Sequence, residues 1–215
     1  MNSPIYREIQ KADYPAIQDI FCRAFQFDHG DISPRVLRLY LSFYLYMYLR
    51  LYRYSLVAEL DGQVAGFLLG CFRRPANPFY HWKDRLIYRW NEFRLLFFRE
   101  GRRRVAINRG VDRIDRQLMR GKEGRFDGEL LLFAVRKDLR RFGIGSELTR
   151  RFFDHLRDSG KRSMFLYTDG VCTVDYYRRN GYHLEGELVL RVPVRPVYQS
   201  TFYLFSKEMS DFDGT

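Results

Sequence analysis

The sequence predicts a mixed α/β fold in a single domain of residues 1–215, because strand-like and helix-like segments follow one another along the chain. With 215 residues, the chain is long enough for one complete hydrophobic core and short for two independent domains. Hydrophobic residues make up 46% of the chain and aromatic residues 17%, which argues against disorder. We therefore expect one compact folded domain.

A short strand and two helices are predicted at the start of the chain. Residues 5–9 are typical of a short strand. A helix over 13–25 begins at a capping aspartate, has Pro15 in its first turn and repeats apolar residues at helical spacing. A second helix over 33–52 begins at a Ser-Pro pair. Few polar residues interrupt its tyrosine-rich and leucine-rich body, so it is either buried on more than one face or lines a substrate cleft.

A β-hairpin is predicted next. Two apolar strands, 55–60 and 63–72, flank the dipeptide Asp61-Gly62. This dipeptide favours a type I′ turn because both of its residues readily adopt positive φ angles. Strand character is then lost over residues 73–126. We interpret that segment as a basic, aromatic, helical insertion between the third and fourth strands.

The rest of the chain alternates again between strands and helices. The predicted strands are 129–135, 163–167, 182–192 and 201–207, and the predicted helices are 146–159 and 173–179. The last two strands are expected to pair with each other.

A basic turn with two glycines separates the strand 129–135 from the helix that follows. It contains Arg140, Arg141, Gly143 and Gly145. The first N–H groups of a helix have no partner inside the helix, and the helix dipole is positive there, so an anion binds well. The turn lacks the Gly-Lys-Ser/Thr of nucleotide hydrolases and the third glycine of dinucleotide-binding folds. We therefore expect a phosphate ligand of another kind.

The spacing R-x-x-G-x-G at 140–145 directly follows a strand that ends in Ala134-Val135. This pattern resembles the acyl-CoA signature of the GCN5-related N-acetyltransferase (GNAT) superfamily, and the segment DYYRRNGY at 175–182 is similar to a second motif of that family. The resemblance covers most of the chain outside 73–126. It implies a mixed, mostly antiparallel sheet flanked by helices, acetyl-CoA as co-substrate, and direct attack by a primary amine in a ternary complex.

The resemblance also implies where acetyl-CoA binds. In this superfamily the strand before the turn diverges from its neighbour, and its free backbone groups pair with the pantetheine arm. Main-chain N–H groups of the turn then hold the pyrophosphate. The residues at those positions in this chain are Phe133, Ala134, Val135, Arg140, Arg141, Phe142, Gly143, Ile144, Gly145 and Ser146.

Two residues are candidates for the chemistry. Tyr177 matches the family tyrosine that often protonates the departing CoA sulfur, although a purely packing role is the alternative. Glu129 stands eleven residues before Arg140, where histone-acetylating members carry a general base, and a solvated strand end is its alternative. The segment before Tyr177 reads TDGVCTVDYY and lacks the asparagine that family members often carry there.

We expect no bound metal, no disulfide and no transmembrane helix. The four histidines, spread over 29–183, show no spacing typical of a metal site. The three cysteines are odd in number and widely spaced, which fits a reducing cytoplasm, and Cys172 is expected to be a small core residue. The chain has neither a secretory signal nor an apolar stretch of about 18 residues.

Most of the net charge of +11 lies in the insertion. Residues 72–126 contain 16 Lys and Arg but 6 Asp and Glu, a net charge of +10. Over 81–99, one helical face is apolar and the remainder is basic. The apolar residues are Trp82, Leu86, Trp90, Phe93 and Phe97. Three interpretations stay open: a helix packed on the domain with a solvated basic face, contact with a membrane surface or lipid-linked substrate, and contact with nucleic acid or an acidic protein.

Two functions remain after this reading of the sequence. The favoured one is an N-acetyltransferase that uses acetyl-CoA, with a primary amine of unknown identity as its acceptor. The alternative is a non-catalytic binding module that recognises an anionic surface through residues 81–126. A homodimer is compatible with both. A basic, aromatic insertion disfavours a polycationic acceptor unless acidic residues elsewhere line the cleft.

Overall fold

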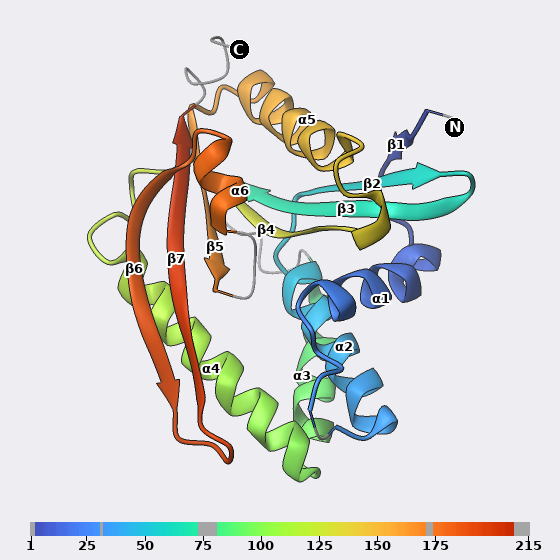
Figure 1. The fold of residues 1–215 in the computed structure, drawn as a ribbon, viewed down its shortest axis with the longest axis vertical. Helices are drawn as coiled ribbons and strands as arrows, with labels where there is room; N and C mark the ends of the chain where they lie inside the picture. The colour runs from blue at the N-terminus through green and yellow to red at the C-terminus, as the bar shows by residue number, and fades with distance from the viewer. Residues whose placement is uncertain (1–2, 31, 73–80, 171–173, 209–215) are drawn as a thin grey trace.

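The computed structural model describes the chain except residues 1–2, 31, 73–80, 171–173 and 209–215 (Figure 1). The strands are β1 (Ile5–Arg7), β2 (Tyr54–Leu60), β3 (Gln63–Phe72), β4 (Gly128–Val135), β5 (Ser163–Asp169), β6 (His183–Val192) and β7 (Tyr198–Glu208). The helices are α1 (Tyr14–Ala24), α2 (Pro34–Leu49), α3 (Trp82–Leu95), α4 (Arg99–Met119), α5 (Ile144–Asp158) and α6 (Val174–Arg179). Cys172 lies outside the described residues.

One sheet contains these strands in the order β1-β2-β3-β4-β5-β7-β6. Neighbouring strands are antiparallel, except that β4 and β5 are parallel. The predicted mixed, mostly antiparallel sheet flanked by helices is therefore confirmed, as is the position of α3 and α4 between the third and fourth strands. The predicted boundaries differ from the observed ones by up to three residues, with α5 beginning two residues earlier than expected.

The turn between β2 and β3 has the predicted geometry. Asp61 and Gly62 have φ angles of 51° and 75°. Two successive positive φ angles define a type I′ turn, whose twist matches that of the flanking strands. The hairpin prediction is confirmed because the Asp-Gly dipeptide fixes this geometry locally.

Helices cover both faces of the first half of the sheet. On one face, α1 and α2 bury Phe21 and Leu45 against Phe67 of β3. On the other face, α5 buries Leu148 and Phe152, and the neighbouring β3 residue Leu68 belongs to that second core. The alternation follows from the period of two in a strand, which sends successive side chains to opposite faces.

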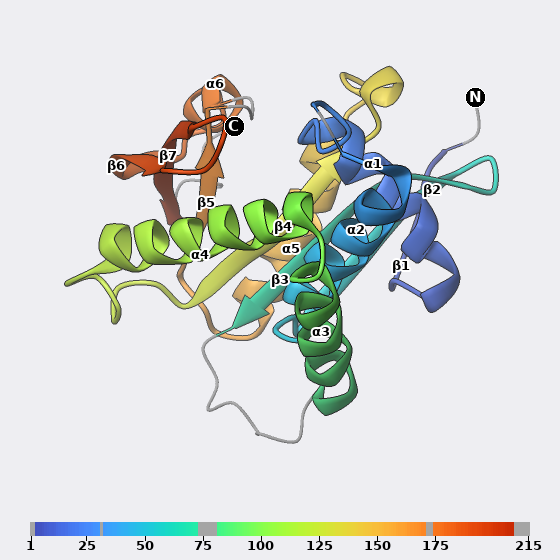
Figure 2. The same cartoon turned by 90° about the horizontal axis from the view of Figure 1, so that it is seen from below.

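Helix α4 joins the two halves of the molecule. Seen from below, it runs from the ends of α2 and α3 across the sheet to β6 and β7 (Figure 2). Ile114 and Leu118 of α4 pack in one cluster with Leu190 of β6 and Leu204 of β7. At its other end, Val105 packs with α2 and α3. The insertion is thus part of the packed structure and covers one side of the sheet.

Helix α3 differs from the sequence expectation in two ways. The predicted helical stretch 81–99 ends at Leu95, and a new helix begins at Arg99. The apolar residues expected to form its packed face are exposed, with Trp90 58% and Phe97 69% accessible. The buried face instead contains Asn91, which donates a hydrogen bond to Ser42 of α2 at 2.9 Å. The helix is therefore packed on the domain with exposed basic residues, as one interpretation held, but its apolar residues are exposed as well.

Gly101 allows the tight corner between α3 and α4. A Cβ at this position would overlap the carbonyl oxygen of Leu95, which is backbone and cannot move aside cheaply. We expect Gly101→Ala to lower the free energy of unfolding by about 2 kcal/mol, as overpacking does. Urea denaturation measures the change.

Gly124→Ala is the control for this corner, because a Cβ at Gly124 meets no heavy atom within 4 Å. That variant is expected to keep the parent's stability. Equal stability of the two variants would show that the corner between α3 and α4 is not constrained as described.

Candidate functional site

Strands β4 and β5 diverge in the middle of the sheet. Their parallel pairing runs from Gly128 to Leu130 of β4, and within the described residues no β5 partner follows for the rest of β4. Strand β4 also has a β-bulge: Leu69 of β3 pairs with Leu132 and Gly70 with Leu130, which leaves one β4 residue between them without a β3 partner. Bulges increase the local twist of a strand. The edge of Phe133, Ala134 and Val135 that faces β5 is therefore unpaired, as the resemblance implied (Figure 1).

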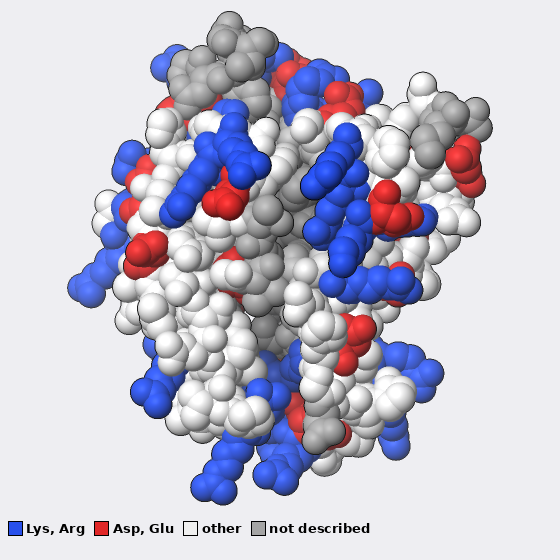
Figure 3. All heavy atoms as spheres, viewed as in Figure 1, with Lys and Arg blue, Asp and Glu red and all other residues white. Residues whose placement is uncertain are grey.

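The turn after β4 has the geometry of an anion site. Arg141 and Gly143 have positive φ angles of 76° and 75°, and Gly143 precedes the first residue of α5. The first N–H groups of α5 point out of the helix start, where the dipole is positive. Arg140 is exposed beside them. On the face in Figure 3, Lys and Arg side chains gather on both sides of the upper end of a furrow in the surface.

Close packing holds the turn against β4. A Cβ at Gly145 would lie 3.2 Å from the ring of Phe133, so only a very small residue fits there without movement. Ile144 is buried in the core under the turn. Phe142 and Ser146 are exposed. The ten predicted cofactor residues thus follow one path from the unpaired edge of β4 to the start of α5, with the buried residues packed beneath the exposed ones.

Tyr177 lies on α6, beside the gap between the diverging strands. Its ring stacks on Phe205 at a centroid distance of 5.6 Å and meets Tyr182 edge-on at 5.3 Å. Tyr182 is buried, and burial raises the pKa of its hydroxyl well above the usual value. The packing role considered for Tyr177 is therefore present, and it fixes the ring at the gap.

A cavity of about 460 Å³ opens between the diverging strands, α2 and α4. Glu129, Phe133 and Tyr177 all line it. The structure thus brings together both catalytic candidates and the first of the cofactor residues. Ala134, Val135 and residues 140–146 do not line the cavity, since they lie farther along the proposed path of the cofactor.

Three acidic residues besides Glu129 line the same cavity, and the sequence reading did not single them out. Asp112 and Asp115 come from α4, and Asp169 from the end of β5. Burial, followed by the nearby carboxylates of Asp112 and Glu129, raises the pKa of Asp115 to about 8. The sequence signal that could have identified Asp112 and Asp115 is their spacing of three residues in a helix whose other charged residues are mostly arginines.

Tyrosines of α2 form the opposite wall of the cavity. Tyr40, Tyr44 and Tyr48 line it at intervals of four residues. Burial raises the pKa of Tyr44 well above its usual value and also raises that of Tyr48, whose hydroxyl donates to that of Tyr44 at 3.4 Å. The leucines of α2 at 41, 45 and 49 lie in the core. The helix is therefore buried on more than one face, as one interpretation held, and its tyrosines also line a cavity.

The described residues contain no group of three or more His, Cys, Asp or Glu placed to hold a metal ion. None of the helices in the described ranges is long and apolar enough to cross a membrane. Cys22 and Cys71 are free thiols.

Solved structures with the same fold are acetyltransferases. Ard1 from Thermoplasma volcanium has a TM-score of 0.53 and 16% identity, over 96% of this chain and 98% of that one. The ribosomal-protein-S18-alanine N-acetyltransferase from Escherichia coli has a TM-score of 0.53 and 13% identity, over 96% and 94%. YncA from Salmonella typhimurium, solved with its cofactor acetyl-CoA, has a TM-score of 0.50 and 16% identity, over 97% and 95%. Identities this low establish a common fold only.

No curated protein sequence matches this chain. The sequence profile of the acetyltransferase (GNAT) family matches residues 14–182, which is well over half of the chain. The unpaired edge of β4 and the glycine turn lie inside that range. The chain therefore belongs to the GNAT acetyltransferase family, whose general reaction is acyl transfer from acetyl-CoA.

Proposed function

We propose that residues 1–215 act as one N-acetyltransferase domain that transfers an acetyl group from acetyl-CoA to a primary amine within a ternary complex. One observation carries the proposal: the unpaired edge of β4 and Tyr177 meet at a single cavity large enough for a second substrate. The free thiols Cys22 and Cys71 support a reducing, cytoplasmic location for the reaction.

The cofactor site in this proposal follows the free hydrogen-bonding groups of the backbone. The edge of Phe133 to Val135 would pair with the amide groups of the pantetheine arm, as an added strand does. The N–H groups between Arg141 and Ser146 would hold the pyrophosphate, and Arg140 would add positive charge. The thioester then lies where β4 enters the cavity.

The proposed chemistry needs one base and one acid. The amine nitrogen attacks the thioester carbonyl carbon, the carbon–sulfur bond breaks, and the nitrogen loses a proton. Glu129 would accept that proton through water, and the Tyr177 hydroxyl would give a proton to the departing thiolate. Both side chains line the cavity, which supports their assignment to these steps. The peptide N–H groups beside the β4 bulge would stabilise the developing oxyanion.

Gly143→Trp tests the cofactor site. We expect acetyl-CoA to bind the parent with micromolar affinity and the variant at least about a hundredfold more weakly, because the hydrogen bonds to the pyrophosphate are lost. Isothermal titration calorimetry measures both affinities.

Gly160→Trp is the matched control for this substitution. Gly160 has a φ angle of 69° and free space around it, and it follows the other end of α5. The control therefore shares the backbone strain but leaves the turn intact. Failure of the folded parent to bind acetyl-CoA would overturn the proposed function.

Tyr177→Phe tests the proton donor. We expect kcat to fall about a hundredfold with acetyl-CoA affinity unchanged, because the ring still packs on Phe205 while the acid is lost. Release of the CoA thiol, followed with a thiol-reactive dye over a panel of primary amines, measures kcat. Tyr176→Phe is the control, since Tyr176 contacts Tyr177 from the same helix. An unchanged kcat in Tyr177→Phe would assign the proton to another donor.

A second candidate function, contact with an anionic membrane surface, rests on the exposed face of α3. We call Trp82, Leu86, Trp90, Phe93 and Phe97 the aromatic stripe; each is more than half exposed, and both tryptophans of the chain belong to it. Exposed Lys83, Arg89 and Arg94 lie beside the stripe on α3. Tryptophan and arginine together favour the interface of an anionic bilayer.

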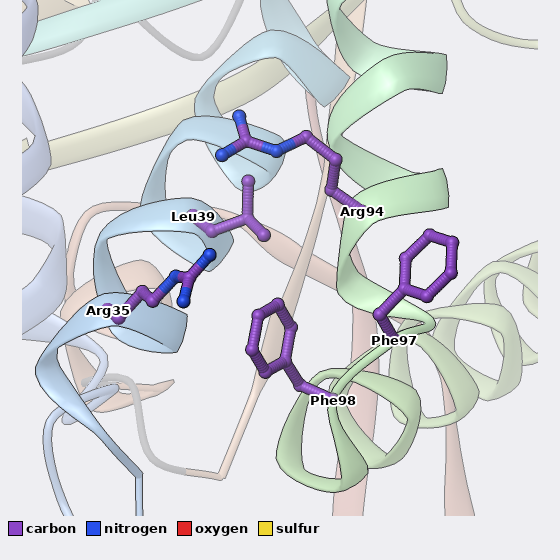
Figure 4. Close-up of a pocket in the computed structure, with 5 residues that line it drawn as sticks. All are labelled: Arg35, Leu39, Arg94, Phe97 and Phe98. Carbon is purple, nitrogen blue, oxygen red and sulfur yellow. The ribbon is translucent and has the colours of Figure 1, made fainter.

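A small cavity beside the stripe adds to this argument. Arg35 of α2 and Arg94 of α3 reach towards the same space of about 190 Å³, which Leu39, Phe97 and Phe98 also line (Figure 4). Both charged residues that line it are arginines, which suits the phosphate of a lipid headgroup.

Vesicle binding tests this second candidate. We expect the parent to sediment with vesicles containing phosphatidylglycerol and not with pure phosphatidylcholine, and high salt to weaken binding. The double variant Trp82→Ser, Trp90→Ser should bind about tenfold more weakly, because it loses the buried apolar area of two rings. Val197→Ser, which removes an exposed apolar residue elsewhere, should bind as the parent does.

Two outcomes would contradict membrane contact. One is equal or absent binding to the two kinds of vesicle. The other is a parent dimer in size-exclusion chromatography that the double variant breaks into monomers, which would assign the aromatic stripe to a homodimer interface.

A further inference from the structure

Helix α4 places two carboxylates over the acceptor side of the cavity. Asp112 and Asp115 line it from α4, Glu129 from β4 and Asp169 from β5. Asp169, Glu129 and Asp112 each act electrostatically on Asp115, so all four lie near one another. Carboxylates gathered in a cavity favour a ligand that carries a positive charge.

Four buried side-chain atoms of residues that line this cavity have no hydrogen-bond partner in the described residues. Two are the Nε atoms of Arg50 and Arg103, and the other two are oxygens. One is Oδ1 of Asp115, which is shielded from solvent. The other is Oγ1 of Thr168, a β5 residue that is 8% exposed and lines the same cavity. Buried polar atoms rarely go unsatisfied, because an unmade hydrogen bond costs about 1–3 kcal/mol. A ligand with an N–H donor would satisfy Oδ1 of Asp115.

The arginines that line the cavity make contacts with other parts of the protein. Arg104 donates to the carbonyl of Phe27 at 2.6 Å and lies 4.9 Å from the ring centroid of Tyr40. Arg50 lies 4.5 Å from the ring centroid of Tyr88. Arg103, the third arginine of the lining, donates to the carbonyl oxygen of Pro196 at 3.4 Å. Arg50 also acts electrostatically on Asp112. Within the described residues, Oδ1 of Asp115 has no hydrogen-bond partner, so this oxygen remains available to a ligand.

Aromatic rings complete the surroundings of the carboxylates. Tyr44 and Tyr48 of α2 line the cavity. The carboxylate of Asp169 disfavours ionisation of the Tyr44 hydroxyl, and the carboxylates of Asp115 and Glu129 disfavour ionisation of the Tyr48 hydroxyl. Tyrosine rings next to carboxylates are a favourable environment for an ammonium group, which is attracted to the ring faces. The remaining aromatic lining suits an apolar body attached to that group.

We propose that the acceptor is an alkylammonium ion on an apolar or aromatic body, whose nitrogen is held by Asp115 before transfer. This inference rests on the proposed function and deepens it, because it names the acceptor class. It assigns the insertion helix α4 to acceptor recognition. Glu129 and Asp169, which lie outside the insertion, also give the cavity the acidic residues without which the sequence disfavoured a polycationic acceptor.

A linked proton gives this site a distinctive signature. The pKa of Asp115 is raised to about 8 by burial and by Asp112, Glu129 and Asp169, while Arg116 lowers it. At pH 7 the empty site therefore holds a proton on Asp115, and a bound ammonium ion would displace it. We expect release of about one proton for each amine bound at pH 7.

The same linkage fixes the sign of a stability effect. The unfolded chain loses this proton near its ordinary pKa of about 4, whereas the folded chain keeps it to about pH 8. The contribution of the Asp115 proton to the free energy of unfolding is therefore fully present below about pH 4, and it is lost as the pH rises towards 8. Asp115→Asn therefore folds at least as well as the parent at pH 8, which keeps the variant usable.

Calorimetry with phenethylamine tests the proposal, with neutral 2-phenylethanol as the probe of equal shape. We expect phenethylamine to bind the parent at least about tenfold more tightly than 2-phenylethanol, and Asp115→Asn to abolish that difference. Asp158→Asn, on the exposed end of α5, is the control that should change nothing.

Proton release provides the second readout. Titrations at pH 7 in two buffers with different ionisation enthalpies should show proton release for the parent and none for Asp115→Asn. Equal affinities for the charged and neutral probes, or proton release that persists in Asp115→Asn, would overturn the proposal.

An acetyl-CoA titration of the same preparations separates this inference from the proposed function. Acetyl-CoA bound by all variants, together with no preference for the cation, would overturn the acceptor class alone. If the folded parent does not bind acetyl-CoA, the proposed acetyltransferase function is overturned, whether or not the amine binds.

Discussion

The divergence of β4 from β5 after Leu130 is the feature on which the site depends. A strand in the middle of a sheet normally has partners on both sides, and an unpaired edge inside a protein is costly unless something else satisfies it. Here the unpaired edge opens the cavity on one side and leads to the glycine turn on the other. The same break therefore provides both a path for the cofactor and room for an acceptor.

The insertion completes the site that this divergence opens. Helix α4 spans the two halves of the sheet, and Gly110 lets it approach β6, where a Cβ would lie 3.0 Å from Val192. This close packing fixes the height of the helix over the cavity. Asp112 and Asp115 reach the cavity from the helix, so acceptor chemistry and insertion packing are physically linked.

Charge is distributed differently on the outside and on the inside of the insertion. The segment 72–126 has a net charge of +10, and its many exposed arginines face water. The side of α4 that meets the cavity contributes both Arg103 and Arg104 and the carboxylates of Asp112 and Asp115, and burial raises the pKa of both carboxylates. Net charge alone suggested an anionic partner for the whole segment. The structure is compatible with an anionic surface outside and a cationic ligand inside, because the two faces of one helix point to different environments.

The sequence alone determined the elements and the turn chemistry. The Asp61-Gly62 hairpin and the positive φ angle at Gly143 follow from local conformational preferences, which act between neighbouring residues. The family resemblance predicted the type of sheet and singled out Glu129, Phe133 and Tyr177, which line one cavity in the structure. These features could be predicted because short segments or a recognisable motif contain them.

Tertiary structure decided which face of each insertion helix meets the protein. Helical spacing grouped the apolar residues of α3 correctly, but spacing cannot tell a packed face from an exposed one, and the packed face carries Asn91 because Ser42 lies opposite. Likewise, Asp115, Glu129 and Asp169 are far apart in the sequence and come near one another only where three elements converge. The proximity and desolvation that shift a pKa depend on that convergence, so the carboxylate cluster could be found only in the fold.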